Sequence, residues 1–472
     1  MQKKDVVKAE RGSFKGTIGF VLAAAGSAVG LGNIWRFPYL AARDGGGLFL
    51  VVYIVLALTF GFTLLITEIS IGRKTKQSPL TAYMHISREW KWIGYFQCLV
   101  PFLILPYYCA IGGWVLKYFT AFLTGHGDDA AEDGYFGDFI TGRTAPGVYM
   151  FIFLAICAVI IYMGVSGGIE KSSRIMMPVL VVLVIVVAVF SLTIKNDDPA
   201  RGVVTGIDGL KVYVIPSLKG ITLKRFLLIV MDALGQLFFS ISVAMGIMIA
   251  YGSYMPDDSN LVKSVNQIEI FDTVIAFLAG VMIIPAVYVF MGPEGMNGGP
   301  SLMFVSLPKV FAQMGVLGNA VGTAFFAMVL FAAVTSAISI LEAVVSSLID
   351  GFGMSRKKAT VMESLIALVI GLVVCFGYNI FYFKVDLPNG TTGQILDIID
   401  YLTNNLLMPF TCIATCILIG WVVKPDTVIK EATRNGEHLG RKWLYIVMIK
   451  FIAPAFLLVL LLMSMGIIKL AD

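Results

Sequence analysis

The sequence predicts an all-α polytopic membrane protein of about eleven transmembrane helices, built as two inverted repeats of five spans. Of the 472 residues, 58% are hydrophobic and only 14% are charged, and the mean hydropathy is +0.86. This composition is too apolar for a domain with a polar surface. Apolar windows long enough to cross about 30 Å of hydrocarbon recur along the chain. Two of these windows are interrupted by small residues at equivalent places in the two halves.

The apolar windows give the order of the spans. They fall at residues 17–42, 46–71, 96–123, 147–164, 175–194, 226–252, 268–290, 319–348, 360–383, 397–422 and 443–467. The run that begins at residue 17 is too long for the apolar core of a cleavable signal peptide, so it is retained as the first span.

Five spans fall in each half of the chain, which predicts six parts. These are a cytoplasmic N-terminal segment (1–16), the first five-span repeat (17–194), an external loop (195–225), the second five-span repeat (226–422), a cytoplasmic loop (423–442), and an eleventh span with an external C-terminus (443–472).

The loop over residues 291–318, within the second repeat, is long for a compact bundle and contains an amphipathic piece near Leu302 to Met314. Loops of this length are commonly functional. We expect this loop to fold back over the bundle as an external lid.

The positions of lysine and arginine predict the orientation. The N-terminal segment and the loops after the second, eighth and tenth spans are basic, whereas Asp128 to Asp138 form an acidic segment. By the positive-inside rule, the basic segments are cytoplasmic and the acidic segment is external. The short loops favour a multi-pass protein of a bacterial inner (plasma) membrane. The exception to the rule is the loop that contains Lys211, Lys219, Lys224 and Arg225.

The composition also argues against several functions. The basic residues lie between spans, so they indicate orientation and not a nucleic-acid partner. The six cysteines lie in apolar runs without a C-x-x-C pair, and there are only three histidines, which favours packing roles over a metal centre. A membrane enzyme needs clustered acids, bases or metal ligands, and a channel needs a continuous polar path. The spans show neither pattern, so we expect no enzymatic activity.

The first and sixth spans are irregular. The first carries Gly26, Gly30 and Gly32, and the sixth reads FFSISVAMGIMIAYGSY, with small residues where a lipid-facing helix would use leucine. Because five is an odd number, the two repeats enter the membrane from opposite sides. Interrupted helices at matching positions of inverted repeats indicate a midplane binding site in a secondary transporter. The alternative for Gly26 and Gly30 is a close helix-packing face.

Six motifs, in order along the chain, resemble those of the neurotransmitter:sodium symporter family. They are RFPYLAARDGGGLFLVVY, EISIGR, YYCAIGGW, GQLFFSISVAMG, AAVTSAISILEA and ILDIIDYL. The similarity covers almost the whole chain and extends to the bacterial amino-acid transporter branch, with LeuT and the tryptophan and tyrosine transporters. It implies a LeuT-like fold and sodium-coupled symport of an amino acid by alternating access. The oligomeric state, and the distinction from a sensor that binds without transporting, stay open.

The resemblance implies two sodium sites at the breaks. An unwound helix exposes carbonyl groups that lipid cannot satisfy, and dehydrated Na⁺ prefers oxygen ligands. Asp272 is the only carboxylate deep in the seventh span, where a cation partner is the default interpretation. The first implied site takes Ala28, Asn33, Ser240, Asp272 and the substrate carboxylate. The second takes Gly26, Val29, Ala332, Thr335 and Ser336.

The resemblance also places a zwitterionic amino acid between the breaks. Half-helix N-termini favour anions and C-termini favour cations, so the two ends of an amino acid are recognised separately. The side-chain lining is apolar with hydroxyl groups at its edges, which predicts a hydrophobic or aromatic L-amino acid. The implied substrate-binding residues are Gly26, Ser27, Ala28, Leu31, Gly32, Ile104, Tyr108, Phe239, Ser240, Ser242, Met245, Ser336 and Ile340.

On the external side, the resemblance implies an ion-pair gate between Arg36 and Asp400, with Phe239 as a lid over the substrate. The alternative for Arg36 is an anchor whose guanidinium extends to the membrane surface.

On the cytoplasmic side, the implied gate pairs Arg11 with Asp350, near Phe14 and Tyr254. Glu68, close to this end of the second span, is interpreted as a buried carboxylate that accepts hydrogen bonds and supports the first break.

The chain departs from the family pattern in ways that bear on chloride. Animal members carry asparagine at the position of Asp272 and, one turn later, a serine that helps to hold chloride, where this chain has Ala276. A carboxylate beside the sodium supplies fixed negative charge, so we expect chloride-independent transport. Other departures from better-known members occur at Phe14, Ser27, Ser240 and Ala244.

Overall fold

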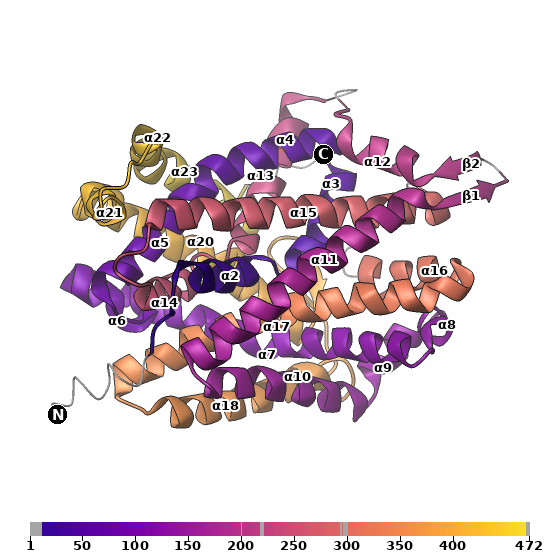
Figure 1. Ribbon diagram of the computed structural model, residues 1–472, viewed down its shortest axis with the longest axis horizontal. Coiled ribbons are helices and arrows are strands. Elements are labelled where there is room, and N and C mark those ends of the chain that lie inside the picture. The colour runs from indigo at the N-terminus through magenta and orange to yellow at the C-terminus, as the bar shows by residue number, and fades with distance from the viewer. Residues whose placement is uncertain (1–11, 200, 218–220, 293–294, 296–300, 469–472) are drawn as a thin grey trace.

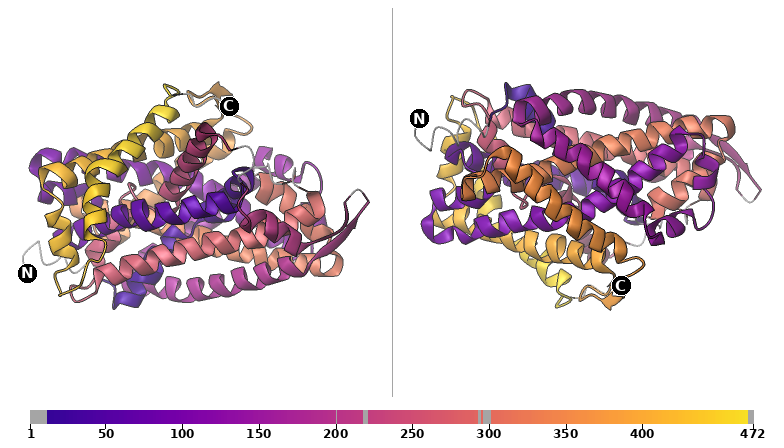
Figure 2. Two further views of the ribbon diagram at one scale, coloured as in Figure 1. Left: turned by 90° about the horizontal axis from the view of Figure 1, so that it is seen from above. Right: turned by 90° about the horizontal axis from the view of Figure 1, so that it is seen from below.

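The computed structural model describes residues 12–199, 201–217, 221–292, 295 and 301–468. Long helices such as α7 (Trp92–Leu123), α15 (Leu261–Met291) and α17 (Gly318–Phe352) run along one axis of the molecule, and the hairpin of β1 (Lys195–Asp198) and β2 (Gly202–Thr205) projects from one end (Figures 1 and 2). The described residues contain two hairpins, each a two-stranded antiparallel sheet. The pairs are β1 with β2, and β3 (Val385–Asp386) with β4 (Thr392–Gly393).

Helices account for most of the described chain. In the first half they are α2 (Thr17–Ala28), α3 (Phe37–Arg43), α4 (Gly47–Leu56), α5 (Phe62–Thr75), α6 (Pro79–Ile86), α7 (Trp92–Leu123), α8 (Gly127–Ala130), α9 (Tyr135–Thr141), α10 (Ala145–Tyr162) and α11 (Lys171–Thr193). In the second half they are α12 (Gly206–Val214), α13 (Leu223–Ser240), α14 (Ile247–Tyr254), α15 (Leu261–Met291), α16 (Leu307–Ala312), α17 (Gly318–Phe352), α18 (Arg356–Phe376), α19 (Ile395–Asp400), α20 (Met408–Ile417), α21 (Asp426–Ala432), α22 (Lys442–Val447) and α23 (Ala453–Ser464).

Several long helices contain a π-helical turn, in which amides bond to the carbonyl five residues earlier. These turns are Gly32–Arg36, Ala57–Gly61, Val165–Glu170, Leu302–Ser306, Tyr401–Leu407, Leu418–Val422 and Met448–Ile452. Short 3₁₀ turns occupy Arg88–Trp90 and Gly315–Leu317.

The described helices agree closely with the predicted spans. Nine are long and apolar enough to cross a membrane, and the bent pair of α2 with α3 makes a tenth. The remaining predicted span, 226–252, is divided into α13 and α14. Several predicted boundaries were wrong. The third and seventh spans start earlier than predicted, at Arg88 and Leu261. The fifth span starts earlier, at Val165, and the ninth ends at Phe376 because the chain turns there.

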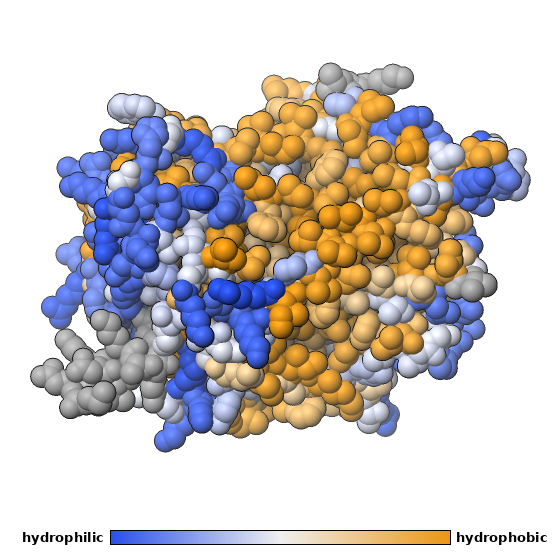
Figure 3. Space-filling model, viewed as in Figure 1, coloured by the Kyte–Doolittle hydropathy of each residue, from blue (hydrophilic) through white to orange (hydrophobic). Residues whose placement is uncertain are grey.

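The surface between the two ends is apolar. Figure 3 shows hydrophilic residues gathered at both ends and a hydrophobic band between them. Val182, Val186 and Val189 on α11 are more than half exposed. Their spacing places them on one face of the helix. Such a band is costly in water and matches the hydrocarbon core of a bilayer.

Helix α17 is the central element of the bundle. It packs against α2, α7, α10, α11 and α18. Every residue from Ala332 to Ser347 is buried. Many of these residues are alanine or serine, and small side chains allow neighbouring backbones to approach closely. The broken α2 therefore lies directly on α17, where a short hydroxyl side chain can reach its backbone.

The predicted lid folds back onto the end of the bundle that carries β1 and β2 (Figure 1). Its helical stretch Leu302–Ala312 buries Phe304, whose ring stacks on Phe136 with centroids 4.9 Å apart. The Phe304 carbonyl accepts a hydrogen bond from the Tyr118 hydroxyl at 2.7 Å. Residues 293–294 and 296–300 of the predicted loop lie outside the described residues.

Ion pairs join the loops at the opposite end, beside the N-terminus. Arg73 is fully buried and pairs with Glu431 at 2.7 Å. Lys76 pairs with Asp257 at 3.0 Å, and its hydrogen bond holds the pKa of Asp257 below the ordinary value. A carboxylate with a lowered pKa stabilises the fold above its unfolded pKa and loses that contribution as the pH falls. Since both partners are largely exposed, the effect is small.

Candidate functional site

The first and sixth predicted spans are both interrupted. The axes of Thr17–Ala28 and Gly32–Arg43 differ by 53°. Residues 241–246 separate α13 from α14, and within them Ser242 and Ala244 adopt positive φ angles of 54° and 61°. Such angles cost a non-glycine residue on the order of 1 kcal/mol or more. Both predicted breaks are confirmed, and the second is held in a strained conformation.

The sequence predicts that Glu68 supports the first break. In the structure, Glu68 instead holds the backbone of the second break. Its Oε1 atom accepts a hydrogen bond from the amide of strained Ala244 at 2.7 Å and another from Gln97 at 3.2 Å. The reason is that Glu68 lies on α5, which packs against α14.

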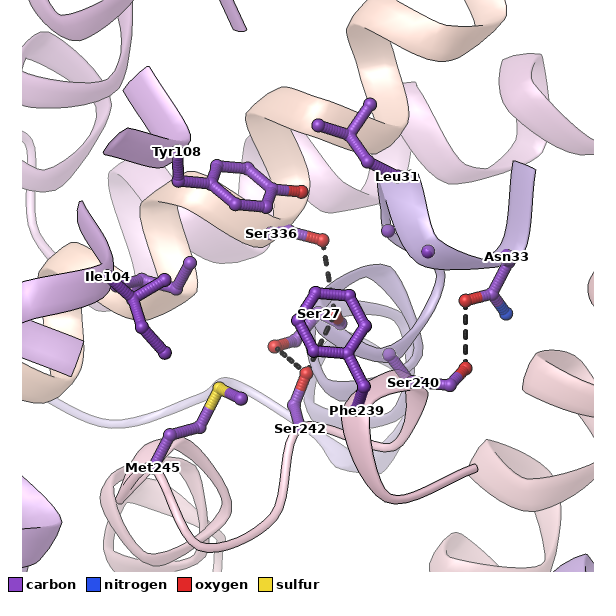
Figure 4. Close-up of a pocket in the computed structure, with 14 residues that line it drawn as sticks. Ser27, Leu31, Asn33, Ile104, Tyr108, Phe239, Ser240, Ser242, Met245 and Ser336 are labelled. Carbon is purple, nitrogen blue, oxygen red and sulfur yellow. Dashed lines mark hydrogen bonds between the residues drawn. The ribbon is translucent and has the colours of Figure 1, made fainter. Parts of the chain in front are cut away.

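A cavity lies between the breaks (Figure 4). Its lining consists of Ser27, Ala28, Gly30, Leu31, Gly32, Asn33, Ile104, Tyr108, Phe239, Ser240, Ser242, Met245, Ser336 and Ile340. Every predicted substrate-binding residue is present except Gly26. Gly30 was missed, and Asn33, predicted as a sodium ligand, also lines the cavity. A Cβ added to Gly26 would lie 3.1 Å from Thr335 and 3.0 Å from Met177. Gly26 therefore has no room for a side chain where α2 packs on its neighbours, and its carbonyl stays a predicted sodium ligand.

One end of the cavity suits a carboxylate. The Tyr108 hydroxyl is buried and makes no hydrogen bond to any described residue. The half-helix that begins at Gly32 presents its N-terminus to the cavity, where amide groups lack partners within the helix. A buried donor without an acceptor costs about 1–3 kcal/mol. These groups are thus placed to receive an anionic ligand.

Serine hydroxyls from α2, from the second break and from α17 meet at the backbone of Ser27 (Figure 4). The Ser27 hydroxyl donates to the Ser242 hydroxyl at 3.1 Å, and Ser242 donates to the Ser27 carbonyl at 2.9 Å. Ser336 on α17 donates to the same carbonyl at 3.1 Å. Ile104, Met245 and other apolar side chains form much of the remaining wall, and no charged residue lines the cavity.

The predicted first sodium site is a cluster of side-chain oxygens beside the cavity. The Ser240 hydroxyl lies 2.8 Å from Asn33 Oδ1 and 2.5 Å from Asp272 Oδ1. Asn33 Nδ2 and the Tyr53 hydroxyl also donate to the Asp272 carboxylate, at 2.8 and 3.0 Å. Asp272 is 1% exposed and pairs with no cationic side chain in the described chain. Buried, converging oxygens with one negative charge fit a hard monovalent cation.

The residues of the predicted second sodium site lie on or directly after α2 and on α17, and these two helices pack against each other. Ser336 Oγ lies 3.4 Å from the Gly26 carbonyl, and Thr335 Oγ1 lies 3.1 Å from the Ala332 carbonyl. Val29 directly follows α2 and is buried. All these oxygens are neutral. These oxygens, which come from α2 and α17, are the type of ligand that Na⁺ prefers.

The predicted external gate is not closed by a direct ion pair. Within the described residues, Arg36 and Asp400 interact electrostatically but no nitrogen to oxygen contact joins them. Asp400 accepts a hydrogen bond from Asn404 at 2.6 Å, and Arg36 lies 6.0 Å from the Phe239 ring centroid. A second hollow is lined in part by Arg36, Phe239 and Asn404. The two gate residues are thus near each other without a direct ion pair.

The opposite side of the cavity is tightly closed. Arg11 lies outside the described residues, and Asp350 accepts a hydrogen bond from the Ser78 amide at 2.6 Å. Phe14 is 2% exposed, and its amide donates to the Tyr254 carbonyl at 3.2 Å. Its ring meets Phe20, Tyr251 and Tyr254 edge-on.

Several supporting residues were not predicted. Tyr53 donates to Asp272, and Gln236 donates to the Gly32 carbonyl at 3.1 Å, which satisfies a group freed by the first break. Glu342 binds both guanidinium nitrogens of Arg356 and the Tyr254 hydroxyl at 2.6–2.9 Å. No group of histidine, cysteine and acidic residues that could hold a metal ion occurs in the described part of the chain.

A bundle with two broken helices around a central cavity, flanked by oxygen clusters, defines a secondary transporter of the LeuT-like class. The model of the sodium:neurotransmitter symporter family matches residues 11–127 and 140–471. The chain belongs to this family. It is a sodium-coupled membrane transporter and not an enzyme.

Comparisons with known proteins agree. The chain is 31% identical to the uncharacterized sodium-dependent transporter YhdH of Bacillus subtilis, over 96% of this chain and 97% of YhdH. It is 32% identical to an uncharacterized sodium-dependent transporter of Methanocaldococcus jannaschii, over 93% and 87% of the two chains. The crystal structure of MhsT in complex with L-phenylalanine is 32% identical, with a TM-score of 0.83 over 96% of this chain and all of that chain. The predicted LeuT-like fold is confirmed.

Proposed function

We propose that the protein takes up a hydrophobic or aromatic L-amino acid together with two sodium ions, without chloride, across a bacterial plasma membrane. The N-terminal end of the bundle is then cytoplasmic, in line with its basic loops. The observation that carries the proposal is the cavity between the two breaks. Its unpartnered Tyr108 hydroxyl and half-helix N-terminus lie next to the oxygen cluster of Asp272.

The lining of the cavity supports an apolar substrate side chain. Ile104, Met245 and Ile340 provide apolar surface, and no charged residue of the lining could pair with a charged side chain. A buried unpaired charge costs several kcal/mol. The similar transporter MhsT was crystallised with L-phenylalanine, which supports an aromatic amino acid as the ligand of this chain. Met245 is flexible, so the cavity can adapt to substrates of different shape.

Two sodium ions supply enough free energy for concentrative uptake. A tenfold sodium gradient contributes about 1.4 kcal/mol per ion, and a charge crossing 100 mV adds about 2.3 kcal/mol. Together two ions contribute roughly 7.4 kcal/mol, which concentrates a zwitterion by about five orders of magnitude at the limit. Sodium favours the outward-facing state until substrate completes the site and permits closure. In that closure, Arg36 and Asp400 come into contact above Phe239.

Binding of labelled amino acids to the purified protein tests the proposal. We expect one or more apolar or aromatic amino acids to bind in Na⁺ and not in an equal concentration of choline. The Hill coefficient for Na⁺ should exceed one, because two ions support one substrate. If no amino acid of the panel binds in a sodium-dependent way, both the substrate class and the role assigned to Asp272 are wrong.

Transport should be independent of chloride. The buried carboxylate of Asp272 provides the negative charge that balances sodium, and Ala276 offers no hydroxyl group for an anion. Uptake into proteoliposomes is measured in sodium gluconate and in sodium chloride at equal sodium concentration. Equal initial rates are expected. A loss of more than half of the uptake in gluconate would contradict the prediction.

A further inference from the structure

Arg441, just before α22, binds two membrane spans that lie beside the first sodium site. One guanidinium nitrogen donates to Glu269 Oε1 at 3.3 Å and the other to Glu269 Oε2 at 3.1 Å. The group also donates to Asn266 on the same helix α15. On its other side, it donates to the Leu58 carbonyl at 2.7 Å and lies 3.7 Å from the Phe62 ring centroid. Arg441 therefore links the second predicted span to the seventh.

The π-helical turn Ala57–Gly61 makes the Leu58 carbonyl available to Arg441. The Phe62 amide bonds to the carbonyls of Ala57 and Thr59 and passes over that of Leu58. In a regular α-helix, the Phe62 amide would occupy the Leu58 carbonyl. Local insertions of this kind often occur at functional sites. The same span carries Tyr53, whose hydroxyl binds Asp272 at 3.0 Å.

Glu269 lies one helical turn from Asp272 and is 4% exposed. Residues three apart on a helix are neighbours on its surface. The two carboxylates therefore share one face of α15. Two buried negative charges in this arrangement repel each other, and the bidentate Arg441 guanidinium cancels one of them. The charge left beside Asn33 and Ser240 is then that of Asp272 alone.

We propose that Arg441 and Glu269 are positioning residues that set the charge at the first sodium site, an inference that rests on the proposed role of Asp272. The pair contributes no net charge while both partners are present. Sodium is therefore attracted by one carboxylate, which the substrate carboxylate supplements. Arg441 directly precedes the eleventh span, which lies outside both five-span repeats. Its pair with Glu269 joins the start of that span to the helix that carries Asp272.

Glu269→Gln tests the charge balance. The guanidinium stays in place through Leu58, Asn266 and Phe62, so an unbalanced positive charge remains about one helical turn from the ion. We expect the sodium concentration for half-maximal binding to rise about tenfold. Substrate affinity at saturating sodium should stay near that of the unchanged protein. The double variant Glu269→Gln, Arg441→Met removes both charges, and its sodium affinity should return to within a factor of about three.

Three measurements keep the outcomes distinct. Glu431→Gln removes the carboxylate from another buried arginine pair, that of Arg73, and should leave sodium affinity unchanged. Thermal unfolding shows that each variant is folded. The inference is overturned if sodium affinity is unchanged in Glu269→Gln, or if it does not recover in the double variant. The proposed function still stands in that case, provided that Asp272→Ala loses sodium binding. If Asp272→Ala also binds sodium normally, the proposed function fails first.

Discussion

Asp272→Ala is expected to abolish sodium-dependent amino-acid binding. The substitution removes the one negative charge from a buried cluster that also contains Asn33 and Ser240. Loss of a buried charged partner costs about 3 kcal/mol or more, which lowers sodium affinity by more than about 100-fold. Equilibrium binding of a labelled substrate is measured over a range of sodium concentrations. Tyr53 loses its acceptor as well, so a modest fall in thermal stability should accompany the effect.

Asp272→Asn is the matched control, because the amide keeps one oxygen and nearly the same shape. We expect sodium affinity between those of the original protein and the alanine variant. Sodium affinity that is unchanged in a folded Asp272→Ala protein would remove this residue from the ion site. The first sodium site would then have to be placed elsewhere.

Tyr108→Phe is expected to weaken substrate binding by about 10- to 100-fold, since a hydrogen bond to a charged group contributes about 1.5–3 kcal/mol. The Tyr108 hydroxyl is buried without a partner among the described residues, so its removal should not lower thermal stability. Binding at saturating sodium and thermal unfolding are measured on the same preparation. The combination of lost affinity with retained stability distinguishes a ligand-binding hydroxyl from a structural one.

Tyr118→Phe provides the opposite pattern. The Tyr118 hydroxyl donates to the Phe304 carbonyl at 2.7 Å, so its loss should reduce stability by about 1 kcal/mol and leave substrate affinity unchanged. If Tyr108→Phe behaves like this control, with normal affinity and lower stability, the carboxylate end of the cavity has been assigned wrongly.

The fold was largely predictable because two signals in the sequence are strong. Apolar windows locate spans, since lipid requires continuous hydrocarbon over a fixed length. Glycines and serines inside such windows locate the breaks, since lipid-facing helices rarely contain them. The end of the ninth span was missed because the segment GYNIFYF after Phe376 is as apolar as a helix, although it forms a turn. Hydropathy alone does not separate these cases.

The supporting contacts of the site were less predictable. Nothing in the local sequence distinguishes Tyr53 from the other aromatic residues of the apolar spans. Its role depends on its hydrogen bond to Asp272, which is remote in sequence. Glu68 was recognised as a buried acceptor, but only the packing of α5 against α14 shows that Ala244 is its donor. Such pairs depend on tertiary geometry, for which the residue types give no local pattern.

The shared acceptor at Ser27 has a consequence for the transport cycle. Two hydrogen bonds tie Ser27 to Ser242, whereas the single hydroxyl hydrogen of Ser336 is divided between the Ser27 and Gly26 carbonyls. The first and sixth broken spans are thus more firmly joined to each other than to α17 at this point. A swing of the two as one body about α17 interrupts that divided bond, and it must also break the hydrogen bonds from Tyr251 to Ser339 and from Tyr254 to Glu342 that join α14 to α17. Bound sodium and substrate then decide which of the two orientations is populated.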